Sequence, residues 1–112
     1  MTRRTTTSNI VLRFDMRTSP LCKDTSADRY RAALDMASWA DNQMVNVVGL
    51  SEHHTTCDGF LSAPLQLAGM MIACTKRIRV SVSALLVPLY NPLRLAEDIC
   101  LIDQVAKGRF SV

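Results

Sequence analysis

Hydrophobic residues follow two different spacings along this chain, and the alternation between them predicts strands separated by helices. Residues 9–16 (N-I-V-L-R-F-D-M) alternate between apolar and polar positions, and residues 45–50 form an apolar run rich in valine. Both patterns are typical of strands. Residues 77–87 alternate at first and are then continuously apolar, which indicates a strand buried on both faces. Residues 109–112 have the pattern of a fourth strand at its start.

Helical spacing fills the intervals between these strands. Thr25 and Asp28 stand at the spacing of a capping box, which marks the start of a helix. Two further helices are predicted over 64–74 and 92–106, because each segment begins with a proline, which suits a first helical turn. Gly108 indicates the end of the last one. The apolar stripes of the three helices are Tyr30, Ala33, Leu34, Ala37 and Ala40; Leu65, Leu67, Ala68, Met70, Met71 and Ile72; and Leu95, Ile99, Ile102 and Val105.

Strands that alternate with helices predict an α/β fold with parallel strands and right-handed helical crossovers. A length of 112 residues suits one domain over 1–112. We expect residues 1–8 to form a disordered tail, the helices to cover one face of the sheet, and the first and third strands to be its edges.

Composition narrows the classes of partner. Hydrophobic residues make up 48% of the chain and charged residues 21%, with a net charge of +3. No apolar run is long enough to span a bilayer, so no membrane partner is expected. The few basic pairs have no interleaved aromatic residues, so no nucleic-acid partner is expected either. Four widely spaced cysteines without a C-x-x-C pair, and no secretory signal, favour a cytoplasmic setting.

The candidate chemistry lies directly after residues 45–50, where Ser51, Glu52, His53 and His54 follow the predicted strand. Polar residues at the carboxyl end of a strand occupy the usual catalytic position in α/β folds. Histidine titrates near neutrality and a carboxylate can orient it, so the cluster suits general acid–base work. The alternative is a histidine pair with structural hydrogen bonds only.

Other chemical uses of this region have weaker support. A metal site from His53, His54 and Cys57 is not expected, because adjacent histidines on an extended chain point in different directions. Cys57 could act as a nucleophile with a histidine as its base, but nothing specific supports this role. Two small residues, Ser83 and Ala84, interrupt a bulky strand. They provide either packing room or close approach of a flat ligand to the backbone.

Several motifs together resemble the bacterial luciferase-like flavin-dependent monooxygenases. They are S-E-H-H at 51–54, the Asp58-Gly59 turn, A-P at 63–64, L-V-P-L-Y-N-P at 86–92, and A-E-D-I-C-L-I-D-Q-V-A-K-G-R-F at 96–110. The motifs are individually modest, but their order and spacing also agree. The resemblance extends from about residue 9 to the C-terminus.

The resemblance implies the N-terminal part of a (β/α)8 TIM-type barrel, with reduced FMN, or F420 in sister groups, at the carboxyl ends of the strands. The implied reaction uses O2 on a small organic substrate. His53 matches the family's active-site histidine, with Glu52 and His54 as its neighbours. Ser83-Ala84 matches the cofactor-binding place where the family has a non-prolyl cis peptide beneath the flavin ring. The second and third helices match those that form the family's dimer, so a homo- or heterodimer is expected.

This chain departs from the family pattern at two levels. Met44 and Val45 replace a glycine and an aromatic residue, and Gly49 replaces a frequent tryptophan. The chain also stops before the family's fourth-strand residues and its flavin-phosphate site. We therefore expect 112 residues to be too few for activity alone. The alternatives are a non-catalytic truncated barrel that acts as a dimerising partner, and an F420-dependent oxidoreductase.

Overall fold

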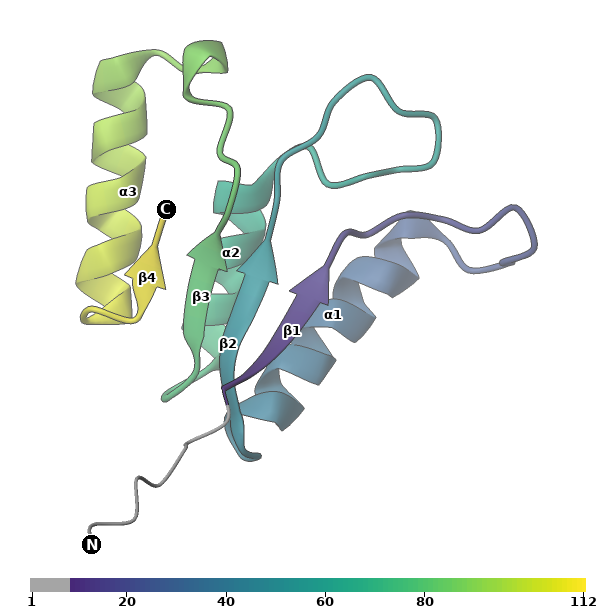
Figure 1. The fold of residues 1–112 in the computed structure, drawn as a ribbon, viewed down its shortest axis with the longest axis horizontal. Helices are drawn as coiled ribbons and strands as arrows, with labels where there is room; N and C mark the ends of the chain where they lie inside the picture. The colour runs from purple at the N-terminus through teal and green to yellow at the C-terminus, as the bar shows by residue number, and fades with distance from the viewer. Residues whose placement is uncertain (1–8) are drawn as a thin grey trace, which may run out of the picture.

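The computed structural model describes residues 9–112 as a four-stranded parallel sheet with a helix between consecutive strands (Figure 1). The sheet order is β1-β2-β3-β4. The elements are β1 (Ile10–Phe14), α1 (Ser26–Asp41), β2 (Val45–Leu50), α2 (Pro64–Cys74), β3 (Arg79–Val82), the 3-10 turn η1 (Val87–Leu89), α3 (Pro92–Ala106) and β4 (Phe110–Ser111). The predicted α/β class with parallel pairing is confirmed. The predicted tail at 1–8 lies outside the described residues.

All three strand pairs are parallel and their registers are regular at the carboxyl ends. Phe14 pairs with Leu50, and Leu50 pairs with Val82. β4 extends the sheet beyond β3, because Val80 pairs with Phe110 and donates its N–H to the Arg109 carbonyl at 2.8 Å. The expectation that the third strand is an edge is therefore wrong. Among the described strands, β1 and β4 are the edges.

One face of the sheet forms the core. Val48, Leu50, Val80 and Val82 are at most 2% exposed. Figure 1 shows α1 and α2 behind the strands, and α3 beside β4. The alternate residues on β1 to β3 therefore face away from the helices, which corresponds to the inner side of a barrel. Within 9–112, no helix is both long enough and apolar enough to cross a membrane.

The predicted helix starts are confirmed. Thr25 caps α1 with a complete capping box, in which its hydroxyl accepts from the Asp28 N–H and the Asp28 carboxylate accepts from the Thr25 N–H. Asn91 caps α3 through its side-chain oxygen, and Pro92 follows in the first turn. Two helix positions differ from the predicted stripes, because Met70 and Val105 are 55% and 53% exposed.

The third strand ends five residues earlier than predicted. The chain leaves the sheet after Ala84, because this residue has a φ of +69°, a left-handed conformation that a strand ladder cannot continue. Pro88 has no N–H to donate, which also disfavours a strand there. Leu86 and Val87 are 39% and 52% exposed, so the predicted burial of this run on both faces is wrong.

Candidate functional site at the carboxyl end of the sheet

The strand ladder continues one step beyond β2 and β3 before the loops diverge. The Ser83 N–H donates to the Leu50 carbonyl at 2.8 Å, and the Glu52 N–H reaches the Ala84 carbonyl at 3.4 Å. Ala84 then turns the chain away with its positive φ. No peptide bond in residues 9–112 is cis, so the predicted cis bond between Ser83 and Ala84 is wrong. Instead, the same dipeptide contains an unfavourable left-handed alanine.

Glu52 is the buried centre of the site, with 2% of its surface exposed. One carboxylate oxygen, Oε2, accepts from the Leu86 N–H at 2.6 Å. The other, Oε1, lies 2.7 Å from His54 Nε2 and accepts from the Tyr90 hydroxyl at 2.9 Å. Burial on its own raises the pKa of Glu52, but these hydrogen bonds outweigh it and hold the pKa below its usual value. Glu52 is therefore a carboxylate with both oxygens engaged.

Tyr90 is the residue of this group that the sequence did not single out. Burial, together with the hydrogen bond to Glu52 and the negative charge of that carboxylate, raises the pKa of Tyr90 to about 12. The only sequence signal for a role of Tyr90 is its place within the motif L-V-P-L-Y-N-P, and Tyr90 lies 38 residues from its hydrogen-bond partner Glu52. No spacing rule links positions so far apart.

His53 takes a different environment from its neighbours. Its ring stacks on Phe60, with 3.6 Å between ring centroids and 8° between planes. The backbone N–H of His53 donates to the Leu61 carbonyl at 2.8 Å. Its Nδ1 is buried and has no hydrogen-bond partner among residues 9–112. With its proton on Nε2, the ring avoids burying an N–H group that has no acceptor.

Phe60 is itself held by the neighbouring loop. The Arg17 guanidinium lies 5.3 Å from the Phe60 ring centroid and forms a 2.7 Å ion pair with Asp58. The Thr18 N–H donates to the Asp58 carbonyl at 2.7 Å. Gly59 has a φ of +75°, which confirms the predicted turn. These contacts join the loop after β1 to the loop after β2 beneath the stack of His53 on Phe60.

A cavity of about 320 Å³ opens beside this stack. Its lining residues are Arg13, Phe14, Asp15, Gly49, Leu50, Ser51, His53 and Phe60. Glu52 and His54 are not among them. A Cβ at Gly49 would lie 3.3 Å from Arg13 Cγ, so the Arg13 side chain covers the space that a larger residue at position 49 would fill. Of the three predicted acid–base residues, only His53 lines the cavity.

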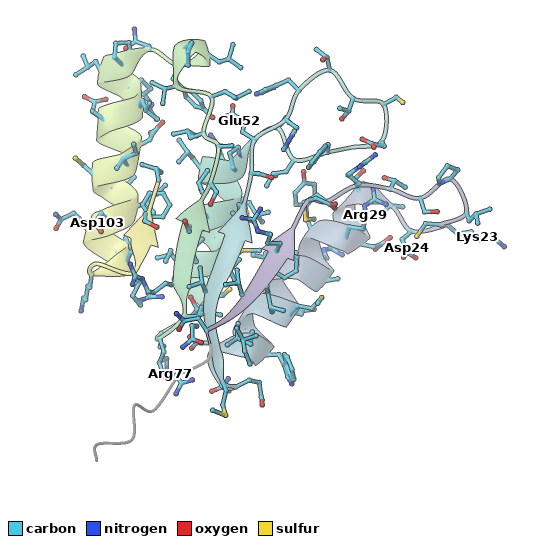
Figure 2. All side chains as sticks on the ribbon, in the orientation of Figure 1. Lys23, Asp24, Arg29, Glu52, Arg77 and Asp103 are labelled. Carbon is cyan, nitrogen blue, oxygen red and sulfur yellow. The ribbon has the colours of Figure 1, made fainter. Side chains whose placement is uncertain are left out.

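The opposite end of the sheet has a structural role. Buried Asp41 accepts three backbone N–H groups, from Lys76, Arg77 and Ile78, at 2.6–2.8 Å. Burial raises the pKa of Asp41, but these donors outweigh it and the net pKa is lowered. Figure 2 shows Glu52 and Arg77 at opposite ends of the sheet. In barrels of this kind the amino end stabilises the fold and the carboxyl end holds the site.

The remaining candidates do not join the site. Cys57 is exposed and has a free thiol, as do Cys22, Cys74 and Cys100. In residues 9–112, no group of three His, Cys, Asp or Glu side chains is placed to hold a metal ion. Ser83 and Ala84 are exposed small residues beside Leu50, which lines the cavity.

Comparison with known proteins agrees with this architecture. The chain is 33% identical over 78 residues to the alkanal monooxygenase beta chain of Vibrio harveyi, which covers 70% of this chain and 24% of that protein. It is 40% identical over 65 residues to the alkanal monooxygenase alpha chain of Photorhabdus luminescens, covering 58% of this chain and 18% of that one. The chain thus spans a quarter or less of these relatives.

Solved structures share the fold. The oxygenating constituent of 3,6-diketocamphane monooxygenase from Pseudomonas putida, in complex with FMN, matches with a TM-score of 0.80 at 24% identity, over 91% of this chain and 28% of that chain. The monooxygenase RslO1 from Streptomyces bottropensis matches with a TM-score of 0.82 at 24% identity, over 94% and 32%. The luciferase-like monooxygenase family matches residues 11–112, and the chain therefore belongs to this family.

Proposed function

We propose that this chain supplies part of the active site of a flavin-dependent monooxygenase that uses reduced FMN and O2 on a small organic substrate. One observation carries the proposal: in a chain of this family, His53 lines a cavity at the carboxyl end of the parallel strands. Two of its relatives are alkanal monooxygenases, and one structure with the same fold contains FMN.

The residues beside the cavity fit the ring of such a cofactor. Ser83 and Ala84 are small and exposed at the end of β3, so a flat ring can approach the backbone there. His53 and Phe60 add an aromatic wall. A bound reduced flavin supplies the electrons for oxygen activation. We propose Ser83 and Ala84 as cofactor-contacting residues on this basis.

His53 is the catalytic residue of the proposal. Its stack on Phe60 and its hydrogen bond to Leu61 fix the ring, and its proton on Nε2 is available to a reacting oxygen. Phe60 also limits the access of water to that side of the ring. Glu52 is buried and His54 lies outside the cavity, so both support His53 instead of touching the substrate.

Oxygen consumption with reduced FMN, with the loss of reduced F420 absorbance as comparison, tests the chemistry. Because 112 residues are expected to be too few for activity alone, the assay uses a full-length protein of the family that contains this chain. We expect oxygen consumption above the rate of free reduced FMN, and we expect His53→Ala to lower it by about a hundredfold or more, since general acid–base groups contribute that much. Cys57→Ala, in the same loop and exposed, is the matched control and should retain the wild-type rate. Activity with F420 alone, or a fully active His53→Ala variant, would contradict the proposal.

We further propose assembly as a homo- or heterodimer through α2 and α3. Their outer surfaces carry exposed apolar side chains: Met70 at 55%, Leu93 at 71%, Leu101 at 66% and Val105 at 53%. Light scattering should show a dimer that Leu101→Asp dissociates. Leu21→Asp, at a 93% exposed position in the loop after β1, is the control and should leave the mass unchanged. A monomeric wild type would contradict this assembly.

The alternative is a non-catalytic dimerising partner. It is favoured by the open edge of the sheet at β1, where Ile10 and Val11 are 47% and 48% exposed. The oxygen assay with His53→Ala separates the two proposals, because a non-catalytic partner dimerises without any oxygen consumption that depends on His53. For either role we propose a cytoplasmic setting, where the four free thiols stay reduced.

A further inference from the structure

Three hydrogen-bond donors converge on the buried Glu52 carboxylate from two separate segments. His54 belongs to the loop after β2, and the Leu86 N–H and Tyr90 hydroxyl belong to the segment between β3 and α3. The donors are divided between the two oxygens, with Leu86 on Oε2 and the other two on Oε1. Both oxygens are therefore fixed, and the carboxylate has one orientation.

The backbone around Tyr90 is equally constrained. Its N–H donates to the Val87 carbonyl at 3.1 Å, which closes the 3-10 turn η1. The next residue, Asn91, caps α3. Pro88 and Pro92 stiffen the segment on both sides. The hydroxyl therefore reaches Glu52 from a rigid frame.

We infer that Tyr90 is a positioning residue: through Glu52 it fixes the ring of His54 and the backbone on both sides of His53. Glu52 and His54 flank His53 in the chain, and the carboxylate bonds to His54 while the His53 N–H is held by Leu61. The cavity-lining ring therefore projects from a segment in which the backbone N–H groups of Glu52 and His53 and the side chains of Glu52 and His54 are all hydrogen-bonded. The catalytic consequence rests on the proposed function, but the arrangement of Tyr90, Glu52 and His54 does not.

The arrangement of Tyr90, Glu52 and His54 determines which ring nitrogen of His54 carries the proton. An ionised Glu52 only accepts hydrogen bonds, so neutral His54 must carry its proton on Nε2, which faces the carboxylate at 2.7 Å. When the Tyr90 hydroxyl is removed, His54 remains on Oε1 and Leu86 on Oε2, so the carboxylate is held by two donors instead of three and its position is less fixed. The His54 ring then populates its second neutral tautomer in part, because the acceptor that selects Nε2–H is no longer held in one place.

The test is Tyr90→Phe in the 112-residue chain, with long-range nitrogen–proton NMR spectra of the His54 ring as the readout. Wild type should show a single Nε2–H tautomer, and Tyr90→Phe should show both. Tyr30→Phe is the matched control, because Tyr30 is half-buried on α1 and its hydroxyl makes no hydrogen bond within residues 9–112. The control should keep the wild-type spectrum.

A second variant covers the case in which Tyr90→Phe does not fold. Glu52→Gln places an NH2 group at one of the two oxygen positions; at Oε1 it donates to His54 Nε2 instead of accepting from it, so the Nδ1–H tautomer of His54 becomes populated. A single unchanged tautomer in a folded Tyr90→Phe, or in Glu52→Gln, would overturn the inference.

Activity provides the second readout. In the active protein, Tyr90→Phe should lower kcat by about tenfold with little change in KM, as expected when a catalytic ring is displaced without loss of substrate contacts. An unchanged kcat would overturn the positioning role. A wild type without oxygen consumption contradicts the proposed function only, and the NMR comparison then decides the inference alone.

Discussion

The most direct physical consequence of the Glu52 site is the titration of Tyr90. Ionisation of Tyr90 would place a phenolate 2.9 Å from an existing carboxylate in a partly buried position. Burial, the hydrogen bond to Glu52 and the negative charge of that carboxylate together raise the pKa of Tyr90 from 10 to about 12. We predict that Glu52→Gln, which removes the negative charge and keeps most of the shape, returns the pKa of Tyr90 toward 10.

The difference of about two pH units corresponds to roughly 3 kcal/mol, at about 1.4 kcal/mol for each unit. Because the folded state holds the Tyr90 proton more tightly than the unfolded chain, this stabilisation is fully present below pH 10. It is lost as the pH rises from 10 to about 12. The free energy of unfolding should therefore fall in this window for wild type, and fall less for Glu52→Gln.

The assay is the near-ultraviolet absorbance of phenolate against pH, with circular dichroism recorded on the same samples to establish that the protein stays folded. The chain has two tyrosines, so the Tyr30→Phe background isolates the Tyr90 signal. A folded Tyr30→Phe protein in which Tyr90 ionises near pH 10 would refute the hydrogen bond to a charged Glu52. An identical titration in the Tyr30→Phe protein with and without Glu52→Gln would refute it equally.

Three further predictions concern stability, each measured by urea unfolding of the chain. Asp41→Ala should lower the free energy of unfolding by about 2–4 kcal/mol, because three backbone N–H groups lose their shared acceptor. In wild type, the stabilisation that comes from the lowered pKa of Asp41 should be lost in acid, as the pH falls from the pKa of the unfolded chain to that of the folded protein. Gly49→Ala should raise it by about 0.5 kcal/mol, because the flexible Arg13 side chain can move a few tenths of an ångström to admit a Cβ; a loss above about 1 kcal/mol would contradict this. Ala84→Gly should raise it by about 0.5 kcal/mol and Ala84→Val should lower it by about 1–2 kcal/mol, because the left-handed backbone suits glycine; equal effects of the two would contradict the reasoning.

The elements of the fold could be predicted because their signals are local. The apolar run at 45–50 and the helix at 64–74 have the predicted bounds. The capping box at Thr25 needs only residues within one helical turn. The polar cluster after β2 was recognised from its position at a strand end, and His53 indeed lines a cavity there.

The parts that could not be predicted depend on contacts between distant residues. The apolar run 77–87 had the pattern of one strand, but Leu86 donates its N–H to Glu52, 34 positions away, and not to a neighbouring strand. Buried Asp41 similarly lies next to the loop before β3. The sequence predicts acid–base roles for Glu52, His53 and His54 together because they adjoin at a strand end, and adjacent residues of an extended chain face opposite sides. Only the fold shows that His53 alone of the three lines the cavity.

The distribution of backbone strain gives an independent indication of which end of the sheet is functional. Among residues 9–112, four residues other than glycine have a positive φ. Three of them, Met16, Thr55 and Ala84, follow β1, β2 and β3 at their carboxyl ends. The fourth, Lys107, is the C-cap of α3, where a left-handed residue is ordinary.

Each unfavourable conformation persists only where surrounding contacts enforce it, and such residues cluster at active sites and ligand clamps. The enforcing contacts are present here: the Asp58–Arg17 pair near the first two loops and the Glu52 hydrogen bonds beside Ala84. At the amino end, Asp41 and Arg109 satisfy backbone groups, and the positive φ of Lys107 there is that of an ordinary helix C-cap. Selection for stability alone would have no reason to concentrate strain at one end of the sheet, whereas a site that needs a fixed His53 and an open backbone at Ser83-Ala84 provides one.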